Sequence, residues 1–122
     1  MPITDLAAWH GENPDYAGHV AACCGGEPGK DPETDREYRD RSPISFVSEL
    51  AEATISVHHG RFDPVVSHRQ SWRLAQKLET AGAERFFFEV FNGGHDIHYE
   101  RAFSWFDGLL GSGGGAAERL TG

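Results

Sequence analysis

Two short apolar runs limit the folds open to this chain more than any other feature of its sequence. The first, Thr54–His58, is rich in β-branched residues and ends close to a glycine, as a buried strand does. The second, Arg85–Phe91, is apolar at almost every position, which is typical of a strand covered on both faces. Each run therefore predicts one strand of a buried sheet.

The stretch between the two strands has the pattern of an amphipathic helix. Ser67 with Gln70 three residues later is a capping-box signature, and Gly82 marks the helix end. The inward positions recur at helical spacing: Ser71, Leu74, Ala75 and Leu78. A strand–helix–strand unit predicts an α/β fold with two parallel strands, joined by a right-handed crossover and flanked by helices.

A sheet of two parallel strands has an edge that needs covering. Parallel sheets normally contain more strands, and a small domain buries too little apolar surface to offset its ordering entropy. We therefore expect a partner to cover the free edge of the 54–58 strand.

The first part of the chain predicts helices and a charged loop. Asp5 can cap a short helix that carries Trp9, and Pro14–Cys24 can form a second helix. Glu27–Asp40 holds two prolines and many charges, so we predict a loop with at most one helical turn. The short element Ser45–Leu50 is expected to pack inward through its apolar residues: Phe46, Val47 and Leu50.

The chain after the second strand predicts a last helix and a tail. The helix should turn one apolar stripe inward: Tyr99, Ala102, Phe103, Phe106 and Leu110. Residues 111–115 are four glycines and one serine, typical of a flexible linker. We predict one partial domain over residues 1–110 and a flexible, Gly-rich tail over 111–122.

Length and charge exclude several kinds of partner. At 122 residues the chain is one domain at most. A net charge of −8 argues against a nucleic-acid surface, which needs clustered lysine and arginine. No apolar run approaches the roughly 18 residues that span a bilayer, and the N-terminus lacks a signal-peptide layout. We expect a cytoplasmic protein with neither a nucleic-acid nor a membrane partner.

The cysteines and histidines give no sign of a cofactor or metal. Cys23 and Cys24 are adjacent, which suits neither a disulfide scaffold nor a zinc site, and we interpret them as small buried or half-buried thiols. Five histidines lie around the two loops that follow the strands: His58, His59, His68, His95 and His98. A metal site also needs convergent geometry, and we expect no metal and no cofactor.

Asp63 and His95 follow the ends of the two predicted strands. Parallel strands place such residues at one edge of the sheet, where α/β proteins build their sites. A carboxylate can hold an imidazole in one tautomer, and the imidazole can then accept the proton of a nucleophile. A plainer interpretation is that Asp63 caps the following helix or stabilises its loop through an Asx-turn.

The residues around this pair resemble the C-terminal portion of a prolyl oligopeptidase-type α/β-hydrolase. His59–Val66, His-Gly-Arg-Phe-Asp-Pro-Val-Val, is similar to the family motif His-Gly-x-x-Asp-x-x-Val, and Gly94-His95 is similar to its second motif. Ser42-Pro43 and the segment Pro2–Leu6 with Trp9 also resemble parts of that family. The resemblance covers roughly residues 2 to 110 and implies a partial α/β-hydrolase fold. It implies Asp63 as triad acid and His95 as triad base.

The family's nucleophile motif is missing. No Gly-x-Ser-x-Gly occurs in the sequence, and Ser112 has the wrong frame. By the resemblance, the nucleophile and oxyanion hole would lie upstream of Met1, and the pair is vestigial in this chain. Ser45, Ser67 and Ser71 fit helix caps or helix-surface positions better than substitute nucleophiles.

Three functional hypotheses remain from the sequence. The first is a truncated serine peptidase or esterase segment that is inactive alone and needs a nucleophile-bearing half. The second is a non-catalytic module that forms a homodimer through the edge of the 54–58 strand, paired antiparallel with its own copy. The third is a small hydrolase with an unrecognised nucleophile.

Overall fold

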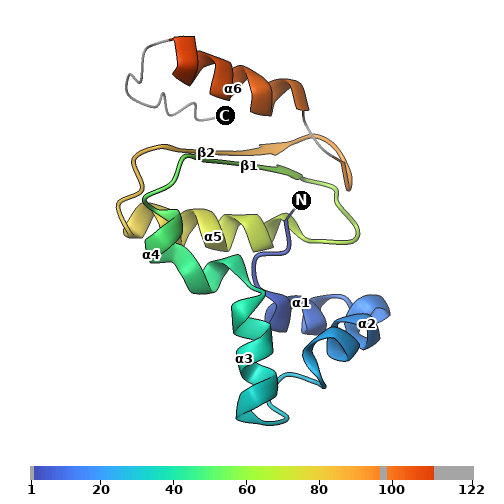
Figure 1. The fold of residues 1–122 in the computed structure, drawn as a ribbon. Helices are drawn as coiled ribbons and strands as arrows, with labels where there is room; N and C mark the ends of the chain where they lie inside the picture. The colour runs from blue at the N-terminus through green and yellow to red at the C-terminus, as the bar shows by residue number, and fades with distance from the viewer. Residues whose placement is uncertain (1, 97–98, 112–122) are drawn as a thin grey trace.

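The computed structural model describes residues 2–96 and 99–111, and it places a two-stranded parallel sheet between helices (Figure 1). The strands are β1 (Ile55–Gly60) and β2 (Phe86–Phe91), with Ile55 beside Phe86 and Gly60 beside Phe91. The predicted parallel strand–helix–strand unit is therefore confirmed. In the described part of the chain, six α-helices accompany this sheet in a mixed α/β fold.

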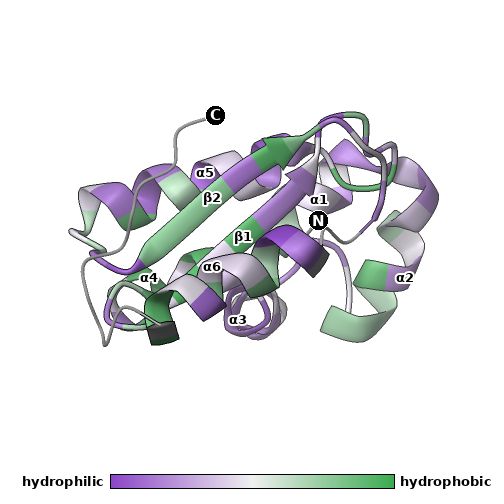
Figure 2. Ribbon diagram, turned by 90° about the horizontal axis from the view of Figure 1, so that it is seen from above, coloured by the Kyte–Doolittle hydropathy of each residue, from purple (hydrophilic) through white to green (hydrophobic). Residues whose placement is uncertain are grey.

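Helices cover both faces of the sheet. Figure 1 shows α5 (His68–Thr80) on one face and α6 (Tyr99–Gly111) on the other. The backbones of both helices lie closer to β1 than to β2, while the side chains of α6 also reach Phe87 and Glu89 of β2. In Figure 2, α6 crosses the sheet on the β1 side, and a hydrophilic band runs across the two strands. His58 and Glu89 are paired in register across the two strands.

The first three helices form a group on the far side of α5 (Figure 1). They are α1 (Leu6–Glu12), α2 (Pro14–Cys24) and α3 (Pro32–Asp40). Their buried residues share one apolar cluster with the loop after β1: Trp9, Val20, Cys24, Tyr38 and Val66. Cys24 is buried as expected, but Cys23 is exposed.

Helix α3 contradicts the predicted loop at 27–40. Asp31 caps it by accepting from the Thr34 amide at 2.7 Å, and Pro32 occupies its first turn, where a missing N–H costs nothing. Tyr38 is buried and donates its hydroxyl to the Gly26 carbonyl at 2.8 Å. One anchoring aromatic and a good cap therefore outweigh the high charge of this stretch.

A second apolar cluster joins α5 to the sheet and to a short helical segment. That segment is a 3₁₀ turn, Pro43–Phe46, followed by α4 (Val47–Leu50). Val47 and Leu50 pack on the cluster of Leu74, Leu78 and Ala83, as predicted. Phe46 does not, because it remains 40% exposed.

Helix α6 turns a different stripe toward the sheet from the predicted one. Trp105 is buried and its ring lies 5.9 Å from that of Phe87, whereas Phe103 is 64% and Leu110 81% exposed. Ala102 is half-buried on the inward side, as predicted. The tail was predicted over 111–122, but Gly111 is the last residue of α6. The side chain of Tyr99 and the rest of that tail, residues 112–122, lie outside the described residues.

Gln70 ties the N-terminal segment to α5 instead of completing a capping box. It is fully buried, and its side-chain oxygen accepts from the amides of Thr4 at 3.0 Å and Asp5 at 2.8 Å. Its amide nitrogen donates to the Asp5 carbonyl and to Glu12. The Ser67 cap is present through the Arg69 amide. Gln70 therefore fixes residues 4 and 5 against α5.

No helix in the described part of the chain is long and apolar enough to cross a bilayer.

Candidate functional site: a buried aspartate and a half-exposed histidine

Asp63 lies in the loop after β1 with its carboxylate fully enclosed. The side chain has no exposed surface, and one oxygen, Oδ1, accepts hydrogen bonds from the amides of Val65 and Val66, each at 2.9 Å. This is the Asx-turn geometry that the sequence allowed, and it leaves the second oxygen, Oδ2, for another partner. The Asx-turn and the acid–histidine interpretations are thus compatible.

The loop that carries Asp63 is held from outside as well. The carbonyl of Val65 accepts from the Trp9 indole at 2.9 Å and from the Asn13 amide group at 2.8 Å. The carbonyl of Val66 lies 2.7 Å from the Nε2 atom of His59. Because both carbonyls are bonded to other elements, the carboxylate is fixed in one position before any partner arrives.

The loop that carries His95 packs directly on the end of β1. The Phe62 amide donates to the Gly93 carbonyl at 2.9 Å, and the Arg61 amide donates to the Phe91 carbonyl at 2.8 Å. A Cβ atom at Gly60 would overlap the Gly94 carbonyl oxygen and lie 2.6 Å from that of Gly93. A glycine is therefore required at position 60 for the two loops to meet.

The two loops bring Asp63 and His95 into contact. The Nδ1 atom of His95 lies 2.9 Å from Oδ2 of Asp63, and the His95 side chain is 43% exposed. With Nδ1 donating to the carboxylate, Nε2 is left as the proton acceptor, and no described residue hydrogen bonds to it. This is the arrangement in which a carboxylate orients an imidazole as a general base.

The electrostatics keep Asp63 ionised. Burial raises the pKa of Asp63, but hydrogen bonds from the Val66 amide, His95 and the Val65 amide outweigh it, so the pKa lies below its usual value of 3.8. A charged Asp63 can stabilise the imidazolium form of His95 when that ring takes a proton.

His59 forms a second contact to the same carboxylate, which the sequence did not reveal. Its Nε2 atom lies 3.4 Å from Oδ2 of Asp63 and also faces the Val66 carbonyl, so Nε2 carries the hydrogen. Its Nδ1 atom lies 2.6 Å from the Ser71 hydroxyl, which must then be the donor. Burial lowers the pKa of His59 below its usual value, so the ring is neutral near pH 7.

Ser71, His59 and Asp63 together look like a catalytic triad but are built as a core network. The side chains of His59 and Asp63 and the whole of Ser71 are fully buried, so no substrate reaches them. The burial of Ser71 agrees with its place in the helical stripe of α5. The interpretation of Ser71 as a cap or surface residue is wrong, because its hydroxyl bonds to a buried histidine. The outward Asp63 contact to His95 is the one that a substrate can reach.

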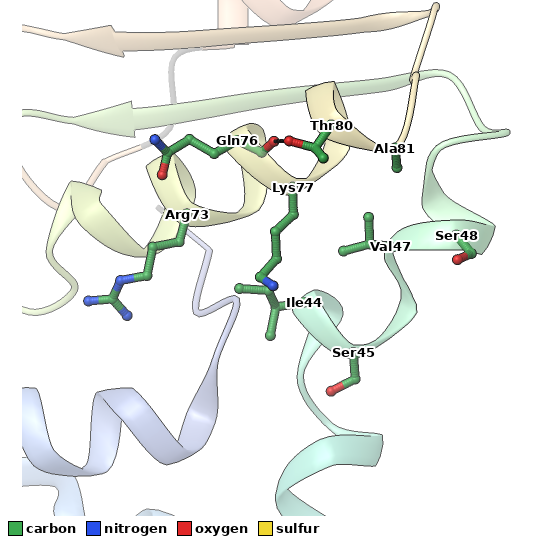
Figure 3. Close-up of a pocket in the computed structure, with 9 residues that line it drawn as sticks. All are labelled: Ile44, Ser45, Val47, Ser48, Arg73, Gln76, Lys77, Thr80 and Ala81. Carbon is green, nitrogen blue, oxygen red and sulfur yellow. Dashed lines mark hydrogen bonds between the residues drawn. The ribbon is translucent and has the colours of Figure 1, made fainter.

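The other two serines considered as nucleophiles, Ser45 and Ser67, form no hydrogen bond with Asp63 or His95 among the described residues. Ser67 accepts from the Arg69 amide as a helix cap, as predicted. Ser45 is exposed in the 3₁₀ turn and lines an open hollow of about 610 Å³ between α5 and the 44–48 segment (Figure 3). Figure 3 shows Lys77 reaching from α5 toward Ile44 across this hollow, whose lining includes neither Asp63 nor His95.

The face of the sheet under α6 has its own polar cluster. The Nδ1 atom of His58 lies 2.8 Å from Glu89, and Glu89 is also 3.4 Å from Arg101 of α6. Ser56 lies 2.9 Å from the other ring nitrogen of His58. This cluster joins β1, β2 and α6, and none of these three interactions involves Asp63. Among the described residues no group of three or more histidine, cysteine, aspartate or glutamate side chains is arranged to hold a metal.

Comparisons with protein-family models, with curated proteins and with solved structures find no match for this chain.

Proposed function

We propose that this chain is the acid-and-histidine portion of a serine hydrolase of prolyl oligopeptidase type, a peptidase or esterase whose nucleophile comes from another polypeptide segment. The proposal rests on one observation above all. A buried, ionised Asp63 holds the Nδ1 side of a half-exposed His95 at 2.9 Å. The resemblance of the 59–66 and 94–95 motifs to that family supports the same proposal.

The proposed chemistry assigns one role to each residue. Nε2 of His95 would accept the hydroxyl proton of the incoming serine as it attacks an acyl carbon, and would later return that proton to the leaving group. Asp63 would stabilise the imidazolium between these steps. Because Ser67 and Ser71 are committed to a cap and to His59, the chain alone should not turn over a substrate.

Complementation tests this proposal. The chain is mixed with a prolyl oligopeptidase-type hydrolase truncated before its acid loop, and hydrolysis of a p-nitrophenyl ester is followed. We expect recovered activity that falls about 10³-fold or more with His95→Gln and with Asp63→Asn. The exposed His19, replaced by glutamine, is the matched control and should leave the recovered rate unchanged.

Two results would contradict the proposal. One is that no hydrolytic activity is recovered with several truncated hydrolases, although NMR shows the Asp63–His95 hydrogen bond to be formed. A slowly exchanging Nδ1 proton on His95 would report that bond. The other is fluorophosphonate labelling of the chain alone that is lost in His95→Gln, since that would reveal an autonomous hydrolase.

A second candidate function is a non-catalytic homodimeric module. The observation that favours it is the outer edge of β1, which has no strand beside it in the described residues. A two-fold axis there would pair β1 antiparallel with its own copy. Sedimentation should then show a dimer at micromolar concentration, and a stable monomer would rule this module out.

A further inference from the structure

The second edge of the sheet, on the outer side of β2, also lacks a partner strand. The carbonyls of Arg85 and Phe91 accept from the amides of Ile55 and Arg61, so the backbone groups of alternate β2 residues face β1. In a parallel pair both backbone groups of a residue point to the same side. The N–H and C=O groups of Phe86, Phe88 and Val90 therefore point outward, and within the described residues no strand receives them.

On the face that α5 covers, β2 is less buried than β1. Val57 and His59 of β1 face α5 and are buried, but the β2 residues beside them on that face, Phe88 and Val90, are only half-buried. On this face α5 lies closer to β1 than to β2. On the α6 face the order is reversed, because Phe87 and Glu89 of β2 are buried under α6. Figure 2 shows β2 on the side of the sheet away from α6.

A hollow with mixed apolar and cationic walls runs along the same edge. It has a volume of about 450 Å³ and is lined by Arg61, His68, Arg69, Trp72, Phe88 and Val90. Trp72 is 50% exposed, and its ring lies 6.1 Å from that of Phe88. The apolar floor thus continues from the strand onto α5.

The cations beside this hollow are unusual in so acidic a chain. The net charge is −8, yet two arginines and a histidine lie together here. Arg61 and Arg69 are both exposed. Neither is within ion-pair distance of a described carboxylate, although the charge of Arg69 helps to lower the pKa of Glu12. Other arginines do form such pairs: Arg41 with Glu37, Arg73 with Glu12 and Arg101 with Glu89. The charge of this patch is therefore complementary to that of an acidic peptide.

We propose that the outer edge of β2 binds an extended acidic peptide segment of a partner protein by strand addition. The peptide backbone pairs with Phe86, Phe88 and Val90, and an apolar side chain lies against Trp72 and Phe88. Its carboxylates lie beside Arg61 and Arg69. The site is separate from the Asp63–His95 pair and goes beyond the hydrolase proposal.

Fluorescence anisotropy with defined peptides tests the site. The probe is a labelled eight-residue peptide, Val-Thr-Glu-Thr-Val-Thr-Glu-Thr, blocked at both ends, whose valines and glutamates share one face of an extended strand. A peptide with lysine in place of glutamate should bind at least tenfold more weakly, and so should one with N-methylated amides on the residues that would pair. Affinity for the glutamate peptide should also fall as salt rises.

Charge reversal on the protein gives the matched comparison. The double variant Arg61→Glu/Arg69→Glu should lower affinity for the glutamate peptide at least tenfold and improve affinity for the lysine peptide. The control Arg36→Glu/Arg39→Glu reverses two exposed arginines on α3 and should bind like the wild type. His95→Gln should also bind normally, so failure of this proposal is distinguishable from failure of the hydrolase proposal.

Three results would overturn strand addition of an acidic peptide. Equal affinity for the glutamate and lysine peptides removes the charge argument, and equal affinity for the N-methylated peptide removes the backbone argument. A failure of the glutamate peptide to bind, together with a dimer that Arg61→Glu/Arg69→Glu abolishes, would assign the edge to a second copy of the chain.

Discussion

At the scale of single residues, Asp63 is buried and yet keeps its charge. Burial alone would favour the neutral acid. Two backbone amides and two histidine rings lie around the carboxylate instead, at distances of 2.9 to 3.4 Å. Each donor favours the ionised form, so the charge is compensated without a lysine or arginine.

The substitution Asp63→Asn should destabilise the fold by about 1–3 kcal/mol near pH 7, because the new amide group presents a donor to histidine donors. The pKa of Asp63 is lowered in the folded state, so its contribution is fully present above the unfolded value of 3.8 and is lost as pH falls through the folded pKa. Urea unfolding at pH 7 and between about pH 5 and 2 measures both effects.

The exposed Asp15 is the control for this comparison, and Asp15→Asn should change stability by less than about 0.5 kcal/mol. A wild type and an Asp63→Asn variant that lose stability in parallel on acidification would contradict the role assigned to the Asp63 charge.

Ser71 carries a second residue-scale prediction. Ser71→Ala removes the only described donor to Nδ1 of the fully buried His59, which should cost about 1–3 kcal/mol in thermal or urea unfolding. Ser45→Ala, at an exposed position, should be nearly neutral. If Ser71→Ala were equally neutral, the neutral tautomer assigned to His59 would be wrong.

At the scale of elements, the acid loop and the histidine loop depend on a close approach of backbone to backbone. Gly60 is the last residue of β1, and the carbonyls of Gly93 and Gly94 occupy the space where a side chain would go. The 2.9 Å contact between Asp63 and His95 therefore depends on the packing of two peptide backbones.

Gly60→Ala should separate the two loops and destabilise the fold by about 2 kcal/mol or more, because backbone atoms must move to admit the methyl group. Loss of the slowly exchanging His95 Nδ1 proton in NMR spectra would report the broken pair. The control is Gly18→Ala in α2, where nothing lies within 4 Å of the added carbon and helix propensity should add about 1 kcal/mol of stability. A native-like spectrum for Gly60→Ala would contradict the close approach.

The sequence was most informative where one physical signal acted alone. Two apolar runs around an amphipathic stretch sufficed for β1, α5 and β2, and their ends indicated Asp63 and His95. Helix α3 was missed because a charged composition hid one cap and one buried tyrosine. The inward side of α6 was missed because its apolar residues lie on two neighbouring stripes, and contact with Phe87 selects Trp105. The His59–Ser71 bond was not predicted, because helical periodicity places Ser71 on the inward side of α5 but does not identify its partner.

At the scale of the whole molecule, Gln70 connects the three-helix group to the sheet layer. Its side-chain oxygen accepts hydrogen bonds from the backbone amides of residues 4 and 5, as the carbonyls of a neighbouring strand would. The Thr4 carbonyl accepts from the Ile44 amide at 3.0 Å. One fully buried amide thus joins the start of the chain, α5 and the segment before β1.

Gln70→Ala should release residues 4 and 5 and lower global stability by about 2–3 kcal/mol, since several buried backbone groups lose partners. Hydrogen exchange should show faster exchange at the amides of Thr4 and Asp5. Gln76→Ala, an exposed change on the same helix, should leave both amides protected. Unchanged protection in Gln70→Ala would show that the N-terminal segment is held by other contacts.

The hydrogen bonds from Trp9 and Asn13 to the Val65 carbonyl determine which segment must be kept if Asp63 and His95 are transferred to another protein. A cassette cut to residues 42–110 would keep both strands, α5 and α6, and would still encode the acid and the histidine. It would lose two of the donors that hold the acid loop in place, and with them the rigidity on which the proposed proton transfer would depend. A graft of Asp63 and His95 onto a nucleophile-bearing scaffold should therefore include the first two helices.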